Sequence, residues 1–263
     1  MKKQFCTALS ALLLLTYICP RASAQSVDAD ANAADATATN SMSAGQIAGV
    51  AIPSALVLYG VLSLKSGELR GLDYRTREEI LERGQLWNTK ADDYVQFAPA
   101  AAAFVMKFAG VQSRNSLLDM ALMYGLSNAV QGTIVTSSKY LTNRERPDAS
   151  NHFSFPSGHT ATAFVAAEFL HQEYGYKNVW IDIAGYGTAA FVGVARVYKN
   201  RHWVSDVIAG AGVGILSTKG IYWVYPKLKI KWFGKHEHGE ALAFVPVVEY
   251  SGGGGNLAFV CRF

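Results

Sequence analysis

This chain contains few cysteines and carries only a small net charge. Three cysteines occur in 263 residues. Cys6 and Cys19 lie in an N-terminal stretch with the pattern of an export signal, so Cys261 would remain alone and no internal disulfide would be possible. The formal net charge of +4 includes three cations and no acid from residues 1–24, which leaves +1 for the rest of the chain. A nearly neutral protein gives no support for nucleic acid as a partner.

The N-terminus predicts export followed by a flexible connection. Two lysines precede an apolar stretch at 8–15 and the small residues 22–24, which is the order found in a cleaved signal peptide. We therefore expect residues 1–24 to be a signal peptide and Gln25 to begin the mature chain. Residues 25–45 are rich in Ala, Asp, Asn, Thr and Ser. Such a segment buries too little apolar surface to offset its ordering entropy, so we expect a flexible linker.

Long uninterrupted apolar runs are also few. Residues 46–64 carry no charge and are long enough to cross a bilayer, which needs about 20 apolar residues, whereas charged or amide side chains interrupt the other apolar segments. The mean hydropathy of +0.12 is low for a protein made mostly of membrane spans, so a soluble or half-inserted bundle stays open. We predict an all-α domain over residues 46–235, a helical bundle of about six apolar helices near 46–64, 97–111, 115–138, 158–173, 179–195 and 204–224.

Two further segments have a pattern of their own. Residues 76–87 begin with acids and space three large apolar residues for one face, which predicts an amphipathic helix on the body of the protein or on a membrane surface. Near the C-terminus, residues 241–250 and 256–263 alternate or run apolar on either side of four glycines. This pattern predicts a short β-hairpin within a tail of residues 236–263.

Three short stretches combine cations, glycine and histidine at the ends of predicted helices. An oxyanion site is the chemistry that these residue types share. A phosphoryl group spreads negative charge over its oxygens, and its transfer depends on stabilising that charge in line with attack. The stretches are Lys139–Pro147, Phe155–His159 and Arg196–Asp206.

The cations and the glycine predict how such an anion would be held. Lys139, Arg146 and Arg196 supply positive charge, and each arginine can bind two oxygens at once. Ser157 adds a hydroxyl donor. Gly158 lets the backbone approach the anion at a helix N-terminus, where free N–H groups and the helix dipole favour negative charge.

The two histidines of these stretches suggest different tasks. His202 precedes Asp206 by one helical turn, so the carboxylate can hold one ring nitrogen and fix the tautomer that leaves the other free to attack. His159 follows the anion-binding turn and is placed to give a proton to the leaving oxygen and later to take one from water. The pattern calls for no metal and no other cofactor.

Together the stretches resemble the signature of the type 2 phosphatidic acid phosphatase (PAP2) superfamily, written K-x6-RP, PSGH and SR-x5-H-x3-D. Every spacing matches, and the one departure is Ala195, where the family usually has Ser. The resemblance implies a PAP2-like helical phosphatase that hydrolyses phosphate monoesters or diphosphates, with lipid-borne phosphates preferred, through a phosphohistidine and without metal. It assigns the nucleophile to His202, the acid to His159, the orienting carboxylate to Asp206, and phosphate binding to Lys139, Arg146, Ser157, Gly158 and Arg196.

Purely structural interpretations also apply to some of these residues and to the remaining histidines. A segment like Lys139–Pro147 is usually a solvated turn and an isolated Ser-Gly-His a helix cap, but the coincidence of three such stretches favours the site. His236-Glu-His238 has no further ligand at a suitable spacing, so a metal there is disfavoured. His152 and His171 are expected to be structural or surface residues.

Other functions share part of this pattern. A soluble periplasmic acid phosphatase of broad specificity is the main alternative, because the superfamily has soluble members. A vanadium haloperoxidase uses the same site architecture, but its chains are usually much longer. A non-enzymatic envelope adaptor acting through the C-terminal hairpin would leave the His-His-Asp set unexplained.

The predicted bundle also suggests an orientation. If its helices span a membrane, the three stretches fall at one face and the lysines of residues 227–235 at the other, where their excess predicts the cytoplasm. The catalytic face would then be periplasmic, in the bacterial cell envelope. A cleaved signal followed by about six crossings would put that face inside instead. Either one candidate helix does not cross, or the bundle is soluble or monotopic.

Overall fold

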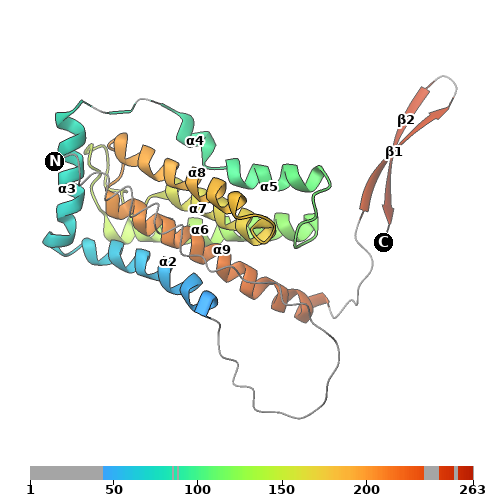
Figure 1. The fold of residues 1–263 in the computed structure, drawn as a ribbon, viewed down its shortest axis with the longest axis horizontal. Helices are drawn as coiled ribbons and strands as arrows, with labels where there is room; N and C mark the ends of the chain where they lie inside the picture. Colours follow the sequence, from blue (N-terminus) through green and yellow to red (C-terminus); the bar gives the residue numbers. More distant parts are fainter. Residues whose placement is uncertain (1–43, 85, 88, 234–242, 252–253, 263) are drawn as a thin grey trace, which may run out of the picture. The chain divides into compact units, whose positions relative to one another are not determined.

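The computed structural model describes residues 44–84, 86–87, 89–233, 243–251 and 254–262 (Figure 1). The predicted signal peptide and nearly all of the predicted linker lie outside the described residues. The chain divides into two compact units, Met1–Tyr222 and Trp223–Phe263.

The first unit is a bundle of helices, which confirms the predicted all-α domain. Its described residues contain no strand, and the last of its helices continues into the second unit. The predicted helices lie close to observed ones, although the last runs to Phe233 and not to residue 224. The helices are α2 (Ala44–Ser63), α3 (Gly67–Glu82), α4 (Ala91–Val95), α5 (Ala98–Phe108), α6 (Leu117–Thr142), α7 (Gly158–Tyr174), α8 (Val179–Tyr198) and α9 (Val204–Phe233).

Polar residues at helix ends determine where the chain turns. The hydroxyl of Ser116 accepts a hydrogen bond from the N–H of Asp119 (3.2 Å) at the start of α6, which satisfies a donor that has no partner within the helix. At the other end, Asn143 has φ 44° and adopts the left-handed conformation, which Asn tolerates better than most residues. The chain therefore leaves α6 at Asn143, one turn after Lys139 and within the first of the three polar stretches.

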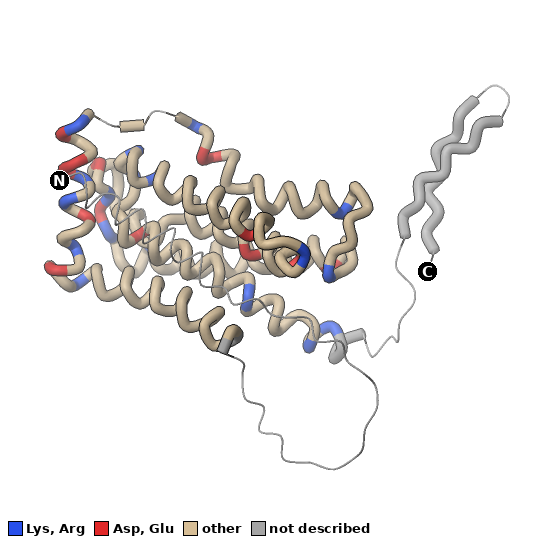
Figure 2. Tube along the Cα trace, in the orientation of Figure 1, with Lys and Arg blue, Asp and Glu red and all other residues tan. Residues whose placement is uncertain are grey.

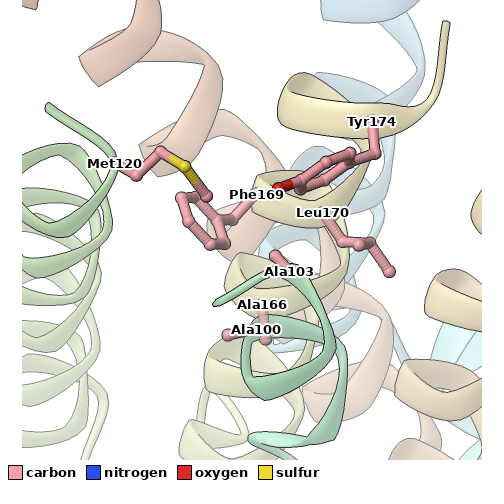
Figure 3. Packing of buried hydrophobic residues seen from close by; sticks show 7 residues of the cluster. All are labelled: Ala100, Ala103, Met120, Ala166, Phe169, Leu170 and Tyr174. Carbon is pink, nitrogen blue, oxygen red and sulfur yellow. The ribbon is translucent and has the colours of Figure 1, made fainter. Parts of the chain in front are cut away.

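Helix α7 is the buried centre of the first unit and packs against α5, α6 and α8. Phe169 and Tyr174 of α7 belong to one apolar cluster with Met120 of α6 and Ala103 of α5 (Figure 3). The alanine leaves room for the two rings, so that α5 approaches α7 closely. The packing holds α7, and with it the second polar stretch, in one place in the bundle.

Glycines on α9 set its distance from two neighbouring elements. A Cβ on Gly210 would stand 2.6 Å from the carbonyl oxygen of Ser157, just before α7. A Cβ on Gly212 would stand 2.7 Å from Cγ2 of Val57 on α2. Both distances are too short for real contacts, so the lack of a side chain permits this close packing.

Helix α3 turns away from α2 by 91° and runs across its end (Figure 1). The prediction of an amphipathic helix over residues 76–87 is wrong at both boundaries, because the helix spans Gly67–Glu82. Ser66 caps its N-terminus through a side-chain hydrogen bond, and the chain leaves the helix at Gly84, whose φ is +60°. The cap at Ser66 and the turn at Gly84 therefore determine the boundaries of α3, and the apolar spacing over residues 76–87 does not.

One helical segment within the described residues, Val204–Lys229, is long and apolar enough by itself to cross a membrane. The segment predicted over 46–64 meets the same criterion only together with α3, across the 91° bend. Figure 2 shows that α2 carries no charged residue, whereas acidic and basic residues gather on α3.

The second unit holds the end of α9 and the strands β1 (Ala243–Ser251) and β2 (Gly254–Arg262). The strands pair antiparallel, with Ala243 opposite Arg262. His236-Glu-His238, for which a metal was disfavoured, lies outside the described residues.

Candidate active site

The three polar stretches meet at one end of the first unit. Ser157, the residue before α7, donates its backbone N–H to the carbonyl oxygen of Asp206 on α9 (3.0 Å). The Nζ atom of Lys139 on α6 lies 3.9 Å from the point where a Cβ on Gly158 would stand. That distance is an ordinary contact, so Gly158 is not required to avoid a clash within the protein. Its missing side chain leaves space beside the lysine, at the start of a helix.

His202 is buried, and its ring has a defined orientation. Its exposed fraction is 2%, and Nδ1 lies 2.8 Å from the carbonyl oxygen of Ser154. A carbonyl oxygen can only accept a hydrogen bond, so Nδ1 carries the proton and Nε2 keeps its lone pair. Burial lowers the pKa of His202 to about 4, because the opposing effect of Asp206 is smaller and the charges of Arg196 and Arg146 disfavour a second proton. The geometry leaves a neutral imidazole with an unshared pair on Nε2.

Asp206 lies behind this ring, but not in the direct contact that the sequence suggested. Its Oδ2 atom is 3.7 Å from Nδ1 of His202, too far for a good hydrogen bond. The fully buried carboxylate accepts from Arg144 Nη1 (2.5 Å), Ser154 Oγ (2.5 Å) and the backbone N–H of Trp203 (3.0 Å). The carbonyl of Ser154 thus orients the ring, and Asp206 supplies a negative charge next to it.

Arg146 and Arg196 each contain a buried Nε–H that finds no acceptor within the described part of the chain. Arg196 is itself 7% exposed and uses Nη1 to donate to Asp92 Oδ2 (3.0 Å). Burial and the charge of Arg196 lower the pKa of Arg146. A buried donor without an acceptor costs about 1–3 kcal/mol, and an oxyanion with several oxygens would satisfy both donors and reduce their repulsion.

The start of α7 adds backbone donors to these cations. The first intrahelical bond runs from Ala161 N–H to the carbonyl of Ser157 (3.0 Å), so the N–H groups of Gly158 and His159 have no partner within the helix. The Ser157 hydroxyl lies 2.9 Å from the hydroxyl of Thr160, and either group can donate. The prediction that Ser157 donates its hydroxyl to an anion stays a prediction.

His159 is paired with a residue that sequence reasoning missed. Its Nε2 atom lies 2.9 Å from Oδ1 of Asp93 on α4, and both side chains are partly exposed. Burial and the charge of Arg196 lower the pKa of His159, although Asp93 acts in the opposite direction. The adjacent Asp92 is fully buried and binds Arg196 and Lys199. The only sequence signal was a pair of acids before the apolar segment at 97–111.

Other residues of the third stretch have partners within the protein. The ammonium of Lys199 lies 2.5 Å from Asp92 Oδ1, Arg201 pairs with Asp148 (3.1 Å), and the indole N–H of Trp203 donates to the carbonyl of Glu145 (2.8 Å). These interactions hold the stretch in place.

Within the part of the chain that the structure describes, no group of three or more His, Cys, Asp or Glu residues is arranged to hold a metal ion. A cavity of about 150 Å³ lies beside the site and is lined by Arg70, Tyr74, Arg144, Glu145 and Trp203. Arg70 and Tyr74 belong to α3, so this helix borders the site.

A neutral histidine with a free Nε2, set among arginines at helix ends in an all-helical unit, is an arrangement suited to phosphoryl transfer. Residues 117–230 match the family model described as the PAP2 superfamily. The chain therefore contains a PAP2 superfamily domain, which confirms the resemblance seen in the sequence. The match ends before β1, so it does not bear on the C-terminal strands.

Named relatives and solved structures are also similar to this chain. Lipid A 1-phosphatase of Porphyromonas gingivalis is 40% identical over 154 residues, covering 58% of this chain and 35% of that protein. Phosphatidylglycerophosphatase B of Bacillus subtilis is 35% identical over 111 residues, covering 37% of this chain and 52% of that protein. The chain thus spans between a third and about half of these relatives. The crystal structure of a transmembrane PAP2 type phosphatidylglycerolphosphate phosphatase from Bacillus subtilis has a TM-score of 0.46 at 20% identity, covering 68% of this chain and 98% of that one.

Proposed function

We propose that this protein is a PAP2-type phosphatase that hydrolyses phosphate esters carried by lipids, through a phosphohistidine on His202. The observation that carries the proposal is the hydrogen bond from His202 Nδ1 to the Ser154 carbonyl (2.8 Å). It commits the other ring nitrogen to the unprotonated form that a nucleophile needs. The unsatisfied Nε–H groups of Arg146 and Arg196 supply donors for the oxygens of the phosphoryl group.

In the first step, Nε2 of His202 attacks phosphorus and the bond from phosphorus to the ester oxygen breaks. The leaving oxygen takes a proton from His159, whose other ring nitrogen is held by Asp93. The positive charge that develops on the His202 ring is balanced by the buried carboxylate of Asp206, 3.7 Å away.

In the second step, water replaces the histidine. His159, now neutral, takes a proton from the water, the new oxygen–phosphorus bond forms, and the bond between phosphorus and Nε2 breaks. The products are inorganic phosphate and the original neutral His202. Lys139, Arg146 and Arg196 would hold the phosphoryl oxygens through both steps, with the Gly158 N–H at the start of α7.

An exposed column of apolar side chains on α6 supports a membrane location and therefore a lipid substrate. The column repeats every four residues, and each member is at least 38% exposed. From its first to its last member it extends about 24 Å at 1.5 Å per residue, close to the hydrocarbon thickness of about 30 Å. An apolar surface of this length is costly in water. Its members are Leu118, Leu122, Leu126, Val130 and Ile134.

The names of the relatives point to the same class of substrate, since they describe phosphatases of lipid A and of phosphatidylglycerophosphate. We further propose an envelope location with the active site facing the periplasm, following a signal peptide at residues 1–24. The surplus of lysine in residues 227–235 supports this orientation.

A substrate panel tests the proposal. Purified protein is assayed for phosphate release from phosphatidic acid, phosphatidylglycerophosphate, a polyprenyl diphosphate, lipid A and p-nitrophenyl phosphate, in the presence of EDTA, with and without detergent. We expect release from lipid esters in mixed micelles, loss of at least about 1,000-fold with His202→Ala, and wild-type rates with the control His152→Ala, whose side chain is exposed. Activity that survives His202→Ala would exclude the nucleophile. A clear preference for the soluble ester, with release of the protein by osmotic shock, would favour a soluble acid phosphatase.

A further inference from the structure

A buried network of charges connects α3 with the His202 segment. Arg144 lies between two carboxylates: its Nη2 donates to Asp73 Oδ2 (2.7 Å), and its Nη1 donates to Asp206 Oδ1 (2.5 Å). The exposed fractions of the three residues are 8% or less. Asp73 belongs to α3, outside the residues that match the family model.

Asp73 also holds the first turn of α9. Its Oδ1 accepts the backbone N–H of Ser205 (2.9 Å), and its Oδ2 accepts the Ser205 hydroxyl (2.6 Å). These bonds satisfy a helix N-terminus in the way that a capping carboxylate does, although the carboxylate comes from another helix. Ser205 follows His202 by three residues, so the same contact fixes the direction in which the chain leaves the nucleophile.

We infer that Asp73 is a positioning residue for His202, acting through Arg144 and the first turn of α9. The hydrogen bonds of Asp73 in the described structure go to Arg144 and Ser205 and not to the ring. Asp73 holds the guanidinium of Arg144, which binds Asp206. Asp206 accepts a hydrogen bond from Ser154 Oγ. The carbonyl of the same serine orients Nδ1 of His202. A chain of hydrogen bonds therefore runs from α3 to the histidine tautomer, and the inference rests on the proposed phosphatase function.

The charges support this role. Two carboxylates around one guanidinium leave a net negative charge on the Nδ1 side of the ring, and it complements the cation formed when Nε2 attacks. The charged groups around His202 in the described structure fall into three sets. The network contributes Asp206, Arg144 and Asp73. The oxyanion site contributes Arg146, Arg196 and Lys139, and the third set is the pair Arg201–Asp148.

The test compares Asp73→Asn with Glu79→Gln in the full-length protein. Asn has almost the same shape and keeps an acceptor for the Ser205 N–H, but its NH2 group faces Arg144 and repels it. Glu79→Gln is the matched control, because Glu79 lies on the same helix and pairs at the surface with Arg83, one turn away. We expect Asp73→Asn to lower kcat about 10- to 100-fold while KM changes less than about 2-fold, because Asp73 binds Arg144 and Ser205, neither of which is assigned to the phosphate.

A second readout needs no turnover. In protein labelled with 15N-histidine, the titration of the His202 ring, assigned by its loss in His202→Gln, should move to lower pH in Asp73→Asn. Arg144 then has one carboxylate fewer to balance it. In an Arg144→Gln background, Asp73→Asn should have no further effect on kcat beyond about 2-fold, because residues acting as one unit are not additive. The double variant keeps the net charge of the wild-type network, since it loses one carboxylate and one guanidinium, and it serves as the second test if Asp73→Asn alone folds poorly.

The outcomes separate the inference from the proposed function. A variant Asp73→Asn with wild-type kcat and an unmoved His202 titration overturns the inference, even if its Tm falls, because a merely structural role predicts that result. Effects of Asp73→Asn and Arg144→Gln that multiply independently also overturn it. A wild-type protein that releases no phosphate refutes the proposed function, and the titration still decides whether Asp73 positions the ring.

Discussion

Lowering the pH should leave the proposed phosphatase activity intact well below pH 6, because the proposed nucleophile, His202, resists protonation. Burial is the largest influence that lowers the pKa of His202 to about 4. Nε2 attacks only when it carries no proton. At pH 5, a group with a pKa of about 4 is roughly 90% neutral, whereas an ordinary histidine with a pKa of about 6.5 is roughly 3% neutral. The buried site therefore predicts about 30 times more active enzyme at pH 5 than an exposed histidine would supply.

The alkaline side of the profile depends on His159, which has to be protonated to assist the leaving oxygen. Burial and the charge of Arg196 lower the pKa of His159, so its proton is lost as the pH rises through a value below its ordinary 6.5. The sign is opposite for the two histidines: activity falls below the pKa of His202 and above that of His159. The expected result is a bell-shaped dependence with an acidic optimum.

The assay measures kcat/KM from pH 3.5 to pH 8 at constant ionic strength. Two substrates whose phosphate groups differ in their second pKa are compared, so that ionisation of the substrate can be separated from that of the enzyme. An acid limb near pH 6.5 that is the same for both substrates would refute the reasoning, because it would mean that His202 is solvated. An acid limb that moves with the substrate would report the phosphate and not the histidine.

The close packing of α2 on α9 and the buried Asp92 of α4 give the remaining predictions. Gly212→Ala should lower the free energy of unfolding by about 1–3 kcal/mol, because its Cβ would meet the Pro53 carbonyl at 2.5 Å. The control is Gly132→Ala, whose Cβ would have nothing within 4 Å. This control should be neutral or stabilising by up to about 1 kcal/mol. Thermal unfolding in detergent measures both, and equal Tm values for the two variants would show that α2 does not pack on α9. Asp92→Asn should lower the free energy of unfolding by about 3 kcal/mol and should also lower kcat, because Arg196 loses its buried counter-charge. Unchanged Tm and kcat would contradict the role assigned to the pair Arg196–Asp92.

Much of the fold was predictable because it depends on short-range patterns. The apolar segments of the sequence lie close to observed helices, and the family domain inferred from three spacings was confirmed by the match over residues 117–230. The boundaries of α3 were predicted wrongly, because the cap at Ser66 and the turn at Gly84 start and end the helix earlier than its apolar spacing suggests. The short helix α4 was not predicted, since its five residues have no apolar repeat.

The sequence by itself determined the chemical groups of the candidate site. A histidine one turn before an aspartate, a glycine at a helix start and three spaced cations all follow from residues near one another in the chain. Only the tertiary structure decided which groups contact them. Arg144 and Asp73 are 71 residues apart, Arg196 and Asp92 are 104 apart, and His202 and the Ser154 carbonyl are 48 apart. The physical reason is that burial and ionic pairing depend on which helix faces which, and the pattern within one segment does not specify the segment that packs against it.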